Sequence, residues 1–495
     1  MTWIGVELVR GRSHEAVAGW RGFLLREGLP FVEVDAPTGR SRVVVALENV
    51  SNTDFGTDSV VILDGVSPPI AGLGCGFVSH VETDGERVRV GGIAELYPAR
   101  PFWPAIFLQT FVDEGSPSAG RLYSACVEQA GRFYLPLALG ELLVARGSGF
   151  HPYPLPGTDT AAEVERVEIL LAAVDHNGIC RILSKVLRLA FTKANVPYVR
   201  KWYYPTVSSS IFLGRLDIDV VDASILMTTA SRFSAYGRRA TFFANASGEE
   251  ETEDSEGKRV PSLRCETEGF ALACLSDAGH EIANHGYWHT VFSERGRCIE
   301  DIGRAQTVLG SLCGSPPKGY GGPGGVWYPS VAEAVVEHGL SYSSELGCGY
   351  DGLPFWTAHR GDCNAALQIP VSPYLQCLLA GQPTIDQFRN GWSQFVRRCL
   401  ARNEPISFIF HPGDFVDGDE PAIDILLEYP DVRRLPDMTF HQFAQWWSRR
   451  DSIRIEAAVV NSKIQIRADQ SIPIEVNNDL MMMEGELITI PATGL

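Results

Sequence analysis

The segment from Gly279 to Thr290 constrains the fold of this chain more than any other. It holds three of the eleven histidines, and two of them, His285 and His289, are four positions apart. On a helical turn this spacing brings both imidazoles to one face, where their nitrogens can bind one metal ion. Pairs at this spacing also occur among purely structural histidines, so a metal site requires a further ligand.

Two carboxylates earlier in the chain can supply that ligand. Asp217 and Asp219 follow an apolar run and are separated by one residue. Residues two apart on a strand point to the same face, so both carboxylates can face one site. One aspartate and two histidines form a facial triad that leaves coordination positions open for water and substrate. This arrangement is typical of a hydrolytic metal site.

A third histidine ends an apolar run much later in the chain. His411 follows Ile406–Phe410 and precedes a Pro-Gly break. A histidine at a strand end is well placed to face a pocket. His411 is therefore a candidate for the same site.

These segments, in this order, resemble the motifs of the polysaccharide deacetylases (carbohydrate esterase family 4, the NodB homology domain). The resemblance covers roughly residues 205–445, and GHEIANHGYWH is its most specific part. It implies an α/β fold whose core is a distorted (β/α) barrel. In such barrels the chemistry lies at the C-terminal ends of the strands.

The resemblance also implies a role for each residue that matches a motif. Asp219, His285 and His289 would bind a divalent metal ion, with Zn²⁺ expected. Asp217 would be the catalytic base, and His411 would be the catalytic acid that protonates the leaving amine.

Two further segments resemble motifs that form the walls of the substrate groove. Lys318–Gly325 resembles the third motif, a Pro-Gly turn, and a backbone N–H near Pro323 is expected to stabilise an oxyanion. Residues 344–373 resemble the fourth motif. The predicted substrate-binding residues are Gly322, Pro323, Gly324 and Trp356.

Two positions depart from the family pattern. The first motif usually has adjacent aspartates, and here Ile218 separates them. A minority with Asp-x-Asp exists, including lipid-linked sugar deformylases, so the second aspartate stays the expected ligand. The third motif normally has an arginine that holds the catalytic aspartate, and its position here is Gly321. The charge is then either absent, which would reduce activity, or supplied from elsewhere, with Arg215 and Arg360 as candidates.

The length of the chain predicts two or three domains. Residues 1–195 alternate strand-like and helix-like segments, which predicts an N-terminal α/β sandwich domain of the flavodoxin or amidotransferase type. Residues 196–448 would form the barrel-like catalytic domain. Residues 449–495 alternate apolar and polar residues between short turns, which predicts a small C-terminal β appendage. Residues 149–163, rich in Pro and Gly, are expected to form a surface connection.

Apolar periodicity also predicts individual elements. Helices are expected over His14–Glu27 and over Leu135–Arg146. Strands are expected over Phe212–Ile218 and Ala240–Phe243 in the catalytic domain. The three methionines Met481–Met483 are interpreted as a packing plug.

Composition limits the partners and the compartment. A net charge of −18 argues against nucleic acid or an anionic membrane as a partner. No segment approaches the apolar length of a membrane span. The N-terminus lacks the basic start and apolar core of a secretory signal, and the eleven cysteines are scattered without a CxxC pair. We therefore expect a cytoplasmic protein with reduced thiols.

The expected reaction is hydrolysis of an N-acyl group, with acetyl favoured, from an amino sugar that is small or carrier-linked. Two alternatives remain. The first is a catalytically silent sugar-binding or scaffold protein, which Gly321 would favour. The second is a hydrolase of a cyclic amide or ureide, similar to the allantoinase-like relatives of the family. The sequence leaves the sugar, the acyl group, the metal and the oligomeric state open, a homo-oligomer included.

Overall fold

The protein is described by a computed structural model. The described residues are 2–11, 13–47, 59–66, 75–84, 87–94, 109–110, 121–122, 126–129, 131–135, 138–144, 176–219, 223–253, 259–263, 266–345, 353–359, 362–371, 379, 383–412, 414–416 and 420–491. The predicted connection 149–163 and Arg360 lie outside them, as do parts of the predicted fourth motif.

The chain divides into two compact units that are each discontinuous in sequence. The first unit contains Met1–Gly147, Ala173–Val207 and Ser448–Leu495, and the second contains Ser148–Ala172 and Ser208–Trp447. The N-terminal and C-terminal segments, predicted as separate domains, thus fall into one unit. The second unit corresponds closely to the predicted catalytic domain.

The first unit is built on an eleven-stranded mixed sheet. Its parallel centre consists of β2 (Phe31–Val34), β1 (Thr2–Val9), β3 (Ser41–Ala46), β4 (Val60–Asp64) and β10 (Arg132–Leu135). Beyond β10 follow the antiparallel strands β9 (Cys126–Gln129), β5 (Cys75–Asp84) and β6 (Arg87–Ala94). A separate ribbon pairs β7 (Gln109–Thr110) with β8 (Arg121–Leu122). Strands β1, β3 and β4 are buried nearly throughout, as expected of parallel strands in the middle of a sheet.

The C-terminal strands extend this unit instead of forming an appendage of their own. β24 (Ile455–Val460), β25 (Lys463–Ala468) and β28 (Leu487–Pro491) continue the sheet from β1. β26 (Ile472–Val476) and β27 (Asp479–Met483) pair with β11 (Val199–Lys201). The predicted β character is therefore present, and β24 covers Thr2–Ile4, the part of this edge of β1 that β2 leaves open. Met481–Met483, interpreted as a packing plug, lies in β27, and of the three only Met483 is buried.

The helices of the first unit are α1 (His14–Glu27), α2 (Leu139–Val144) and α4 (His176–Lys193). The predicted helix over His14–Glu27 is confirmed, with Ser13 as its N-cap and Gly28 in the left-handed conformation at its end. The helix predicted over Leu135–Arg146 is present as α2, while residues 136–137 and 145–146 lie outside the described part of the chain. Leu135 belongs to β10, and the carboxylate of Asp64 accepts hydrogen bonds from the N–H groups of Leu139 and Gly140 at the start of α2.

The second unit is built on a mainly parallel eight-stranded sheet. In spatial order its strands are β21 (Ile406–Phe410), β12 (Phe212–Ile218), β13 (Ala240–Ala244), β16 (Glu281–Asn284), β17 (Gly319–Tyr320), β18 (Tyr342–Ser343), β20 (Asp362–Gln368) and β19 (Phe355–His359). Neighbouring strands are parallel except β19 and β20. Strands predicted over Phe212–Ile218 and Ala240–Phe243 are confirmed as β12 and β13.

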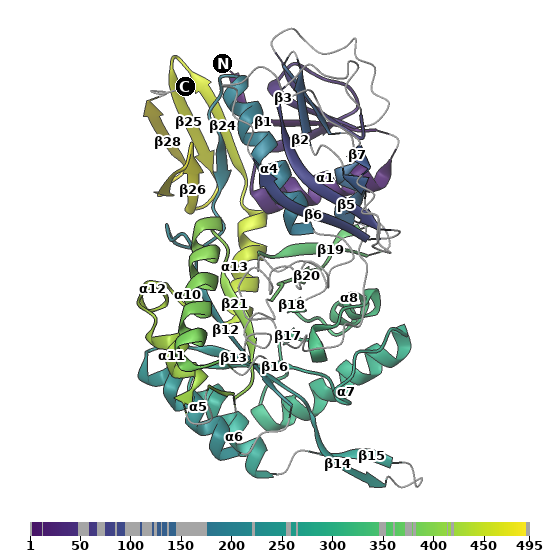
Figure 1. Cartoon of the computed structure of the whole chain (residues 1–495), viewed down its shortest axis with the longest axis vertical. Helices are drawn as coiled ribbons and strands as arrows, with labels where there is room; N and C mark the ends of the chain where they lie inside the picture. Colours follow the sequence, from purple (N-terminus) through teal and green to yellow (C-terminus); the bar gives the residue numbers. More distant parts are fainter. Residues whose placement is uncertain are drawn as a thin grey trace. The chain divides into compact units, whose positions relative to one another are not determined.

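Helices connect successive strands of this sheet. They are α5 (Ala223–Ala235), α6 (Glu266–Asp277), α7 (Arg295–Cys313), α8 (Pro329–Glu337) and α10 (Ile385–Arg402). Figure 1 shows them following one another around the outside of the curled sheet. The chain continues through α11 (Ala422–Glu428), α12 (Pro430–Arg434) and α13 (Phe440–Ser452), and carries the ribbons β14 (Ser247–Glu253) with β15 (Arg259–Leu263) and β22 (Phe415–Val416) with β23 (Glu420–Pro421). The predicted distorted (β/α) barrel is thereby confirmed.

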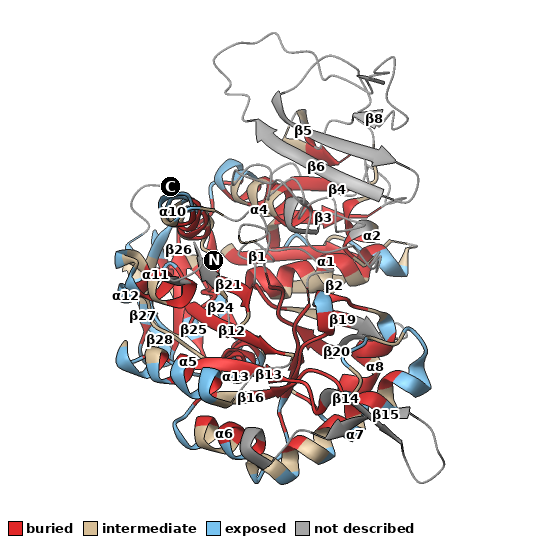
Figure 2. Ribbon diagram, turned by 60° about the horizontal axis from the view of Figure 1, so that its bottom comes forward, coloured by how far each residue is buried: buried red, intermediate tan, exposed pale blue. Residues whose placement is uncertain are grey.

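Alternation along the strands separates an apolar outer face from a polar inner face. Phe212, Leu216 and Ile218 of β12 pack into the core that lies under the helices. Arg215 and Asp217, at the intervening positions, point to the opposite face. Figure 2 shows the strands buried and the exposed residues on the outer sides of the helices. The inner face is therefore where polar side chains from different strands can meet.

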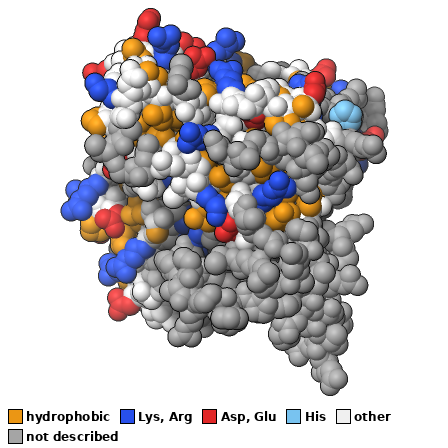
Figure 3. Space-filling view, turned by 90° about the horizontal axis from the view of Figure 1, so that it is seen from above, with side chains coloured by type: hydrophobic (Ala, Val, Ile, Leu, Met, Phe, Trp, Pro, Cys, Tyr) orange, Lys and Arg blue, Asp and Glu red, His pale blue; other side chains and the backbone are white. Residues whose placement is uncertain are grey.

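Two surface properties bear on the predicted partners. Among the described residues, no helix combines the length and the apolar character needed to cross a bilayer. Figure 3 shows one face of the molecule on which described acidic, basic and hydrophobic side chains are interspersed. The excess of negative charge is therefore not gathered into one patch on the described part of that face.

Candidate metal centre

Parallel register brings distant strand ends to one place. Leu216 of β12 lies beside Phe410 of β21, so His411 follows at the level of Asp217. On the other side, Ala244 of β13 lies beside Asn284 of β16, directly before His285. Each of these candidate side chains therefore comes at or just after the carboxyl end of its strand, as predicted for a barrel of this type.

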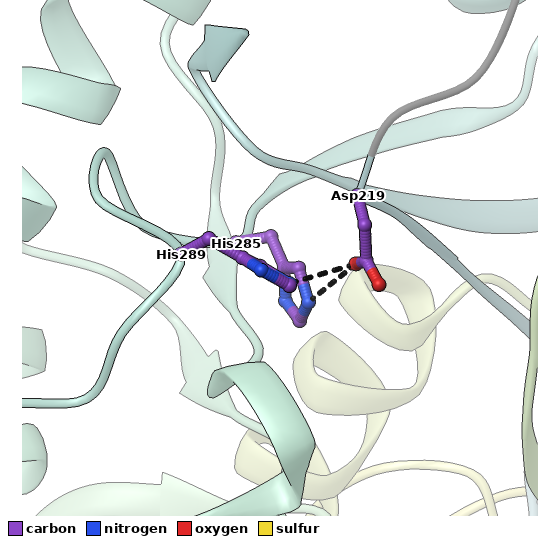
Figure 4. A group of neighbouring side chains, drawn as sticks. All are labelled: Asp219, His285 and His289. Atoms are coloured by element: carbon purple, nitrogen blue, oxygen red, sulfur yellow. Dashed lines mark ion pairs between the residues drawn. The ribbon is translucent and has the colours of Figure 1, made fainter. Parts of the chain in front are cut away.

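Asp219, His285 and His289 come together at this end of the sheet. Each offers one ligand atom, and these atoms lie within 4.8 Å of one another. Oδ1 of Asp219 lies 2.9 Å from Nε2 of His289 and 3.4 Å from Nε2 of His285. Figure 4 shows both imidazoles directed toward the carboxylate. Two imidazole nitrogens and a carboxylate oxygen are donors suited to Zn²⁺ and related divalent ions, so the residues fit the expected metal.

Burial differs between these ligands in a way that leaves one side accessible. His285 is 1 % exposed, whereas the side chains of Asp219 and His289 are 37 % and 39 % exposed. Nδ1 of His285 lies 2.6 Å from the carbonyl oxygen of Gly321 and donates to it, which directs Nε2 toward Asp219. The group is therefore anchored on the inside by His285 and is partly open to solvent at Asp219 and His289.

The loop between the two histidines is not the helical turn that their spacing predicted. β16 ends at Asn284, and residues 285–289 follow without helical structure. Gly286 and His289 both have positive φ, 82° and 51°. The four-residue spacing brings the imidazoles together through this bend, because the loop is held by side chains and not by its own helical hydrogen bonds.

Arg215 is the positive neighbour of Asp217. Its guanidinium donates to both carboxylate oxygens, with Nε 2.7 Å from Oδ1 and Nη2 2.9 Å from Oδ2. It also donates to the carbonyl and hydroxyl oxygens of Ser344, at 2.6 and 3.0 Å. Burial raises the pKa of Asp217, but the charge and hydrogen bonds of Arg215 outweigh it and hold this pKa below its usual value. Asp217 is thus kept ionised by a residue of its own strand.

Gly321 gives Arg215 the room it needs. A Cβ atom at position 321 would lie 2.5 Å from Cδ1 of Phe243 and 3.0 Å from Nη2 of Arg215. The ring of Phe243 is buried, and the guanidinium carbon of Arg215 lies 4.4 Å from its centroid. Neither neighbour can move without disturbing the other. The glycine at position 321, which departs from the third motif, therefore leaves the space that Arg215 occupies beside Asp217.

We expect Gly321→Ala to destabilise the protein by about 1–3 kcal/mol, the usual cost of an extra methyl group in a packed interior. Urea unfolding of the purified variant measures this change. Gly296→Ala is the matched control, because a Cβ there meets nothing within 4 Å. A Gly321→Ala protein as stable as the parent would contradict the steric account of this position.

The turn predicted as a groove wall is a short 3-10 helix, η1 (Pro323–Gly325). Pro323 is buried, whereas Gly324 is exposed and has a φ of 63°. Several N–H groups of the turn already donate within the fold: Gly321 to Asn284 O, Gly322 to Glu345 Oε1, Gly325 to Gly322 O and Val326 to Pro323 O. The predicted oxyanion donor near Pro323 is therefore not one of these four.

Trp356 lies on β19, at the edge of the sheet opposite to β21, and is partly buried. Its role as a substrate contact remains a prediction, as do those of Gly322, Pro323 and Gly324.

His411 reaches the same site from β21. Its Nε2 lies 3.4 Å from Oδ2 of Asp219, and its Nδ1 lies 3.7 Å from Oδ2 of Asp414. Burial lowers the pKa of His411, but the carboxylates of Asp219 and Asp414 outweigh it and raise this pKa to about 10. For Asp219, burial raises the pKa, but hydrogen bonds from the surrounding histidines hold it far below its usual range.

Sequence reasoning missed three groups that support the site. Asp414 also accepts a hydrogen bond of 2.9 Å from the backbone N–H of His411, and its place three residues after that histidine was the available signal. Glu345 is buried behind the η1 turn, and burial raises its pKa to about 7. Asp301 lies on α7 and binds the loop between His285 and His289. The positions of Glu345 and Asp301 follow from tertiary packing, for which no local pattern exists.

Comparison with known proteins finds a family model that matches part of the chain. Residues 219–343 match the polysaccharide deacetylase family. Similar solved structures include a putative polysaccharide deacetylase from Mycobacterium smegmatis (16% identity, 50% of this chain, 94% of that chain, TM-score 0.39), Puue allantoinase (17%, 50%, 93%, 0.38) and Agd3, a carbohydrate deacetylase (11%, 100%, 99%, 0.40). At these scores the three structures decide nothing about substrate. Curated proteins gave no match.

Proposed function

Because residues 219–343 match the polysaccharide deacetylase family, we propose that this protein is a metal-dependent amide hydrolase that removes an N-acyl group, with acetyl favoured, from an amino sugar. The observation that carries the proposal is the convergence of two histidines and one carboxylate beside a second, arginine-held carboxylate. The first group is a metal-ligand set, and the second is a base that stays ionised.

Each residue has a distinct part in the proposed reaction. A divalent ion held by Asp219, His285 and His289 would polarise the substrate carbonyl and lower the pKa of bound water from about 15.7 toward 7. Asp217 accepts the proton of the attacking water, and Arg215 keeps Asp217 ionised beforehand. His411 gives its proton to the nitrogen as the C–N bond breaks, so the products are a carboxylic acid and a free amine.

Arg215 also weakens the case for the silent alternative. Gly321 favoured a silent protein only because a positive charge beside the base was expected to be missing. Arg215 lies within 2.7 Å of Asp217 and supplies that charge. These residues do not distinguish hydrolysis of a cyclic ureide from hydrolysis of an N-acyl group, because both reactions use an attacking water and the same proton transfers.

We expect Arg215→Met to move the acid limb of the pH–rate profile to higher pH. The reason is that the pKa of Asp217 is held down chiefly by Arg215, so its loss raises that pKa and more alkaline solution is needed to ionise the base. The measurement is kcat/KM against pH. Arg215→Lys, which keeps a positive charge, should shift the limb less. An acid limb at the same pH in all three proteins would contradict the role of Arg215.

The substrate we propose is small or carrier-linked, and the compartment we propose is the cytoplasm. Support comes from the acidic composition of the chain. In addition, the described cysteines Cys126 and Cys298 are buried and form no disulfide. A cytoplasmic enzyme would meet biosynthetic sugars and not cell-wall polymers.

The test is a substrate panel with purified protein supplied with Zn²⁺. It contains short N-acetylated and N-formylated amino sugars, long chitin and peptidoglycan strands, and allantoin. Release of acetate or formate from the short sugars, lost on chelation and recovered on adding metal, is the expected result. Binding without release would support the silent protein, and ring opening of allantoin would support the ureide hydrolase. Faster deacetylation of the long strands would contradict the proposed substrate size.

A further inference from the structure

The His289 loop depends on outside support. His289 has a φ of 51° and a side chain that is 39 % exposed. Positive φ is uncommon for any residue other than glycine, and an exposed imidazole gains little from packing. The place of its Nε2 is therefore set by whatever holds the backbone of the loop.

One buried carboxylate makes the central contact with that backbone. Asp301, on α7, is 2 % exposed, and its Oδ1 accepts hydrogen bonds from the N–H groups of Tyr287 at 3.1 Å and Trp288 at 2.8 Å. A Cβ at Gly286 would lie 2.9 Å from Oδ2 of Asp301, so the loop presses closely against the carboxylate. These two bonds take the place of the helical hydrogen bonds that the loop lacks.

The remaining contacts fix the start of the loop. The N–H of Ala246 donates to the carbonyl of Gly286 at 3.0 Å, and the N–H of Gly286 donates to Oδ1 of Asn284 at 2.8 Å. The hydroxyl of Ser247 donates to the carbonyl of Tyr287. Of the contacts described, those of Asp301 reach furthest toward His289.

Burial of the Asp301 carboxylate is energetically unfavourable. Burial raises its pKa to about 6, and the two backbone N–H groups only partly offset that burial. The charge of Arg304 also lowers this pKa, but burial outweighs it. A carboxylate buried at such a cost is a poor source of stability. Such a group is more simply explained by the conformation it imposes on its neighbours.

We propose that Asp301 is a positioning residue for the metal centre, which holds the His289 loop so that Nε2 of His289 meets Asp219. The inference rests on the proposed metal function and adds a residue to it. Residues that hydrogen-bond around a metal site orient its ligands, and loss of such a residue lowers metal affinity about 10–100-fold although every ligand is still present.

The experiment measures metal affinity separately from stability. Zn²⁺ and Co²⁺ are titrated into metal-free wild type, Asp301→Ala, Asp301→Asn and His289→Ala, and the Co²⁺ absorption spectrum and the Tm of each metal-free protein are recorded. Asp301→Ala should bind about tenfold or more weakly with an altered Co²⁺ spectrum. Asp301→Asn, which keeps an acceptor oxygen, should bind with intermediate affinity.

A matched control separates positioning from general stability. Asp437 accepts a hydrogen bond of 3.0 Å from the N–H of Arg239, at the opposite end of β13 from the site. Asp437→Ala should lower Tm while leaving the metal Kd unchanged.

Each further outcome has a definite meaning. If wild type binds no metal, the proposed function fails and the inference fails with it. If His289→Ala weakens binding but Asp301→Ala binds within twofold of wild type, only the inference is overturned. If Asp301→Ala does not fold, Asp301→Asn becomes the test. An Asp301→Asn protein with the same metal Kd and the same Co²⁺ spectrum as wild type would also overturn the inference.

Discussion

Asp219→Asn and His285→Ala should each strip the bound metal and abolish turnover. Oδ1 of Asp219 lies within 3.4 Å of Nε2 of both histidines, and His285 is the candidate ligand that the carbonyl of Gly321 fixes in place. Removing either leaves two donors, which is too few for a tight Zn²⁺ site. Elemental analysis of the purified proteins measures the metal, and acetate release measures turnover.

The control for this prediction is another histidine of the same unit. Nε2 of His338 lies 2.8 Å from the carbonyl of Ile299, well outside the ligand group. His338→Ala should therefore keep both metal and activity. Equal metal contents in wild type, Asp219→Asn and His285→Ala would exclude this site.

Asp217→Asn and His411→Ala should each lower kcat by about 10²–10⁴-fold, the usual contribution of a general base or acid. Both side chains lie beside the ligand group without belonging to it: Oδ2 of Asp217 is 3.8 Å from Nε2 of His285, and Nε2 of His411 is 3.4 Å from Oδ2 of Asp219. Metal content should accordingly stay close to that of wild type. The loss should fall on kcat more than on KM.

Stability has to be followed in the same variants. Asp217→Asn leaves the buried guanidinium of Arg215 without its anionic partner, so a lower Tm is expected there. His411 is 34 % exposed, and its replacement should affect Tm less. An unchanged kcat in either folded, metal-loaded variant would remove that residue from the proposed mechanism.

The strands and most ligands could be predicted because their signals are local. β12 alternates apolar residues with Arg215 and Asp217, so its pattern gave both the strand and the face on which the carboxylate lies. His411 could be placed because it follows a run of mainly apolar strand residues, and His285 was found by its spacing from His289. For such elements, burial of one face decides the structure, and burial is visible in the sequence.

The features that the sequence did not predict depend on contacts between residues far apart in the chain. The bend at His289 could not be read from its spacing, because its conformation is imposed by Asp301 from α7. The pairing of β24 with β1 joins the two ends of the chain, and alternation within a strand does not name its partner. Gly321 suggested that the positive charge beside Asp217 is lost. The space beside Gly321 is occupied by Arg215 from β12, and a local sequence pattern does not reveal this contact.

That shared space has an evolutionary consequence. An arginine at position 321 and an arginine at position 215 would compete for one volume beside Phe243, so neither arrangement can be reached from the other by one tolerated substitution. Starting from this chain, gaining the first arginine overfills the interior, and losing the second strands the carboxylate of Asp217. The two sites are thus epistatic: lineages that carry an arginine at position 215 should keep glycine at position 321, and exchange between the two arrangements should proceed through paired changes.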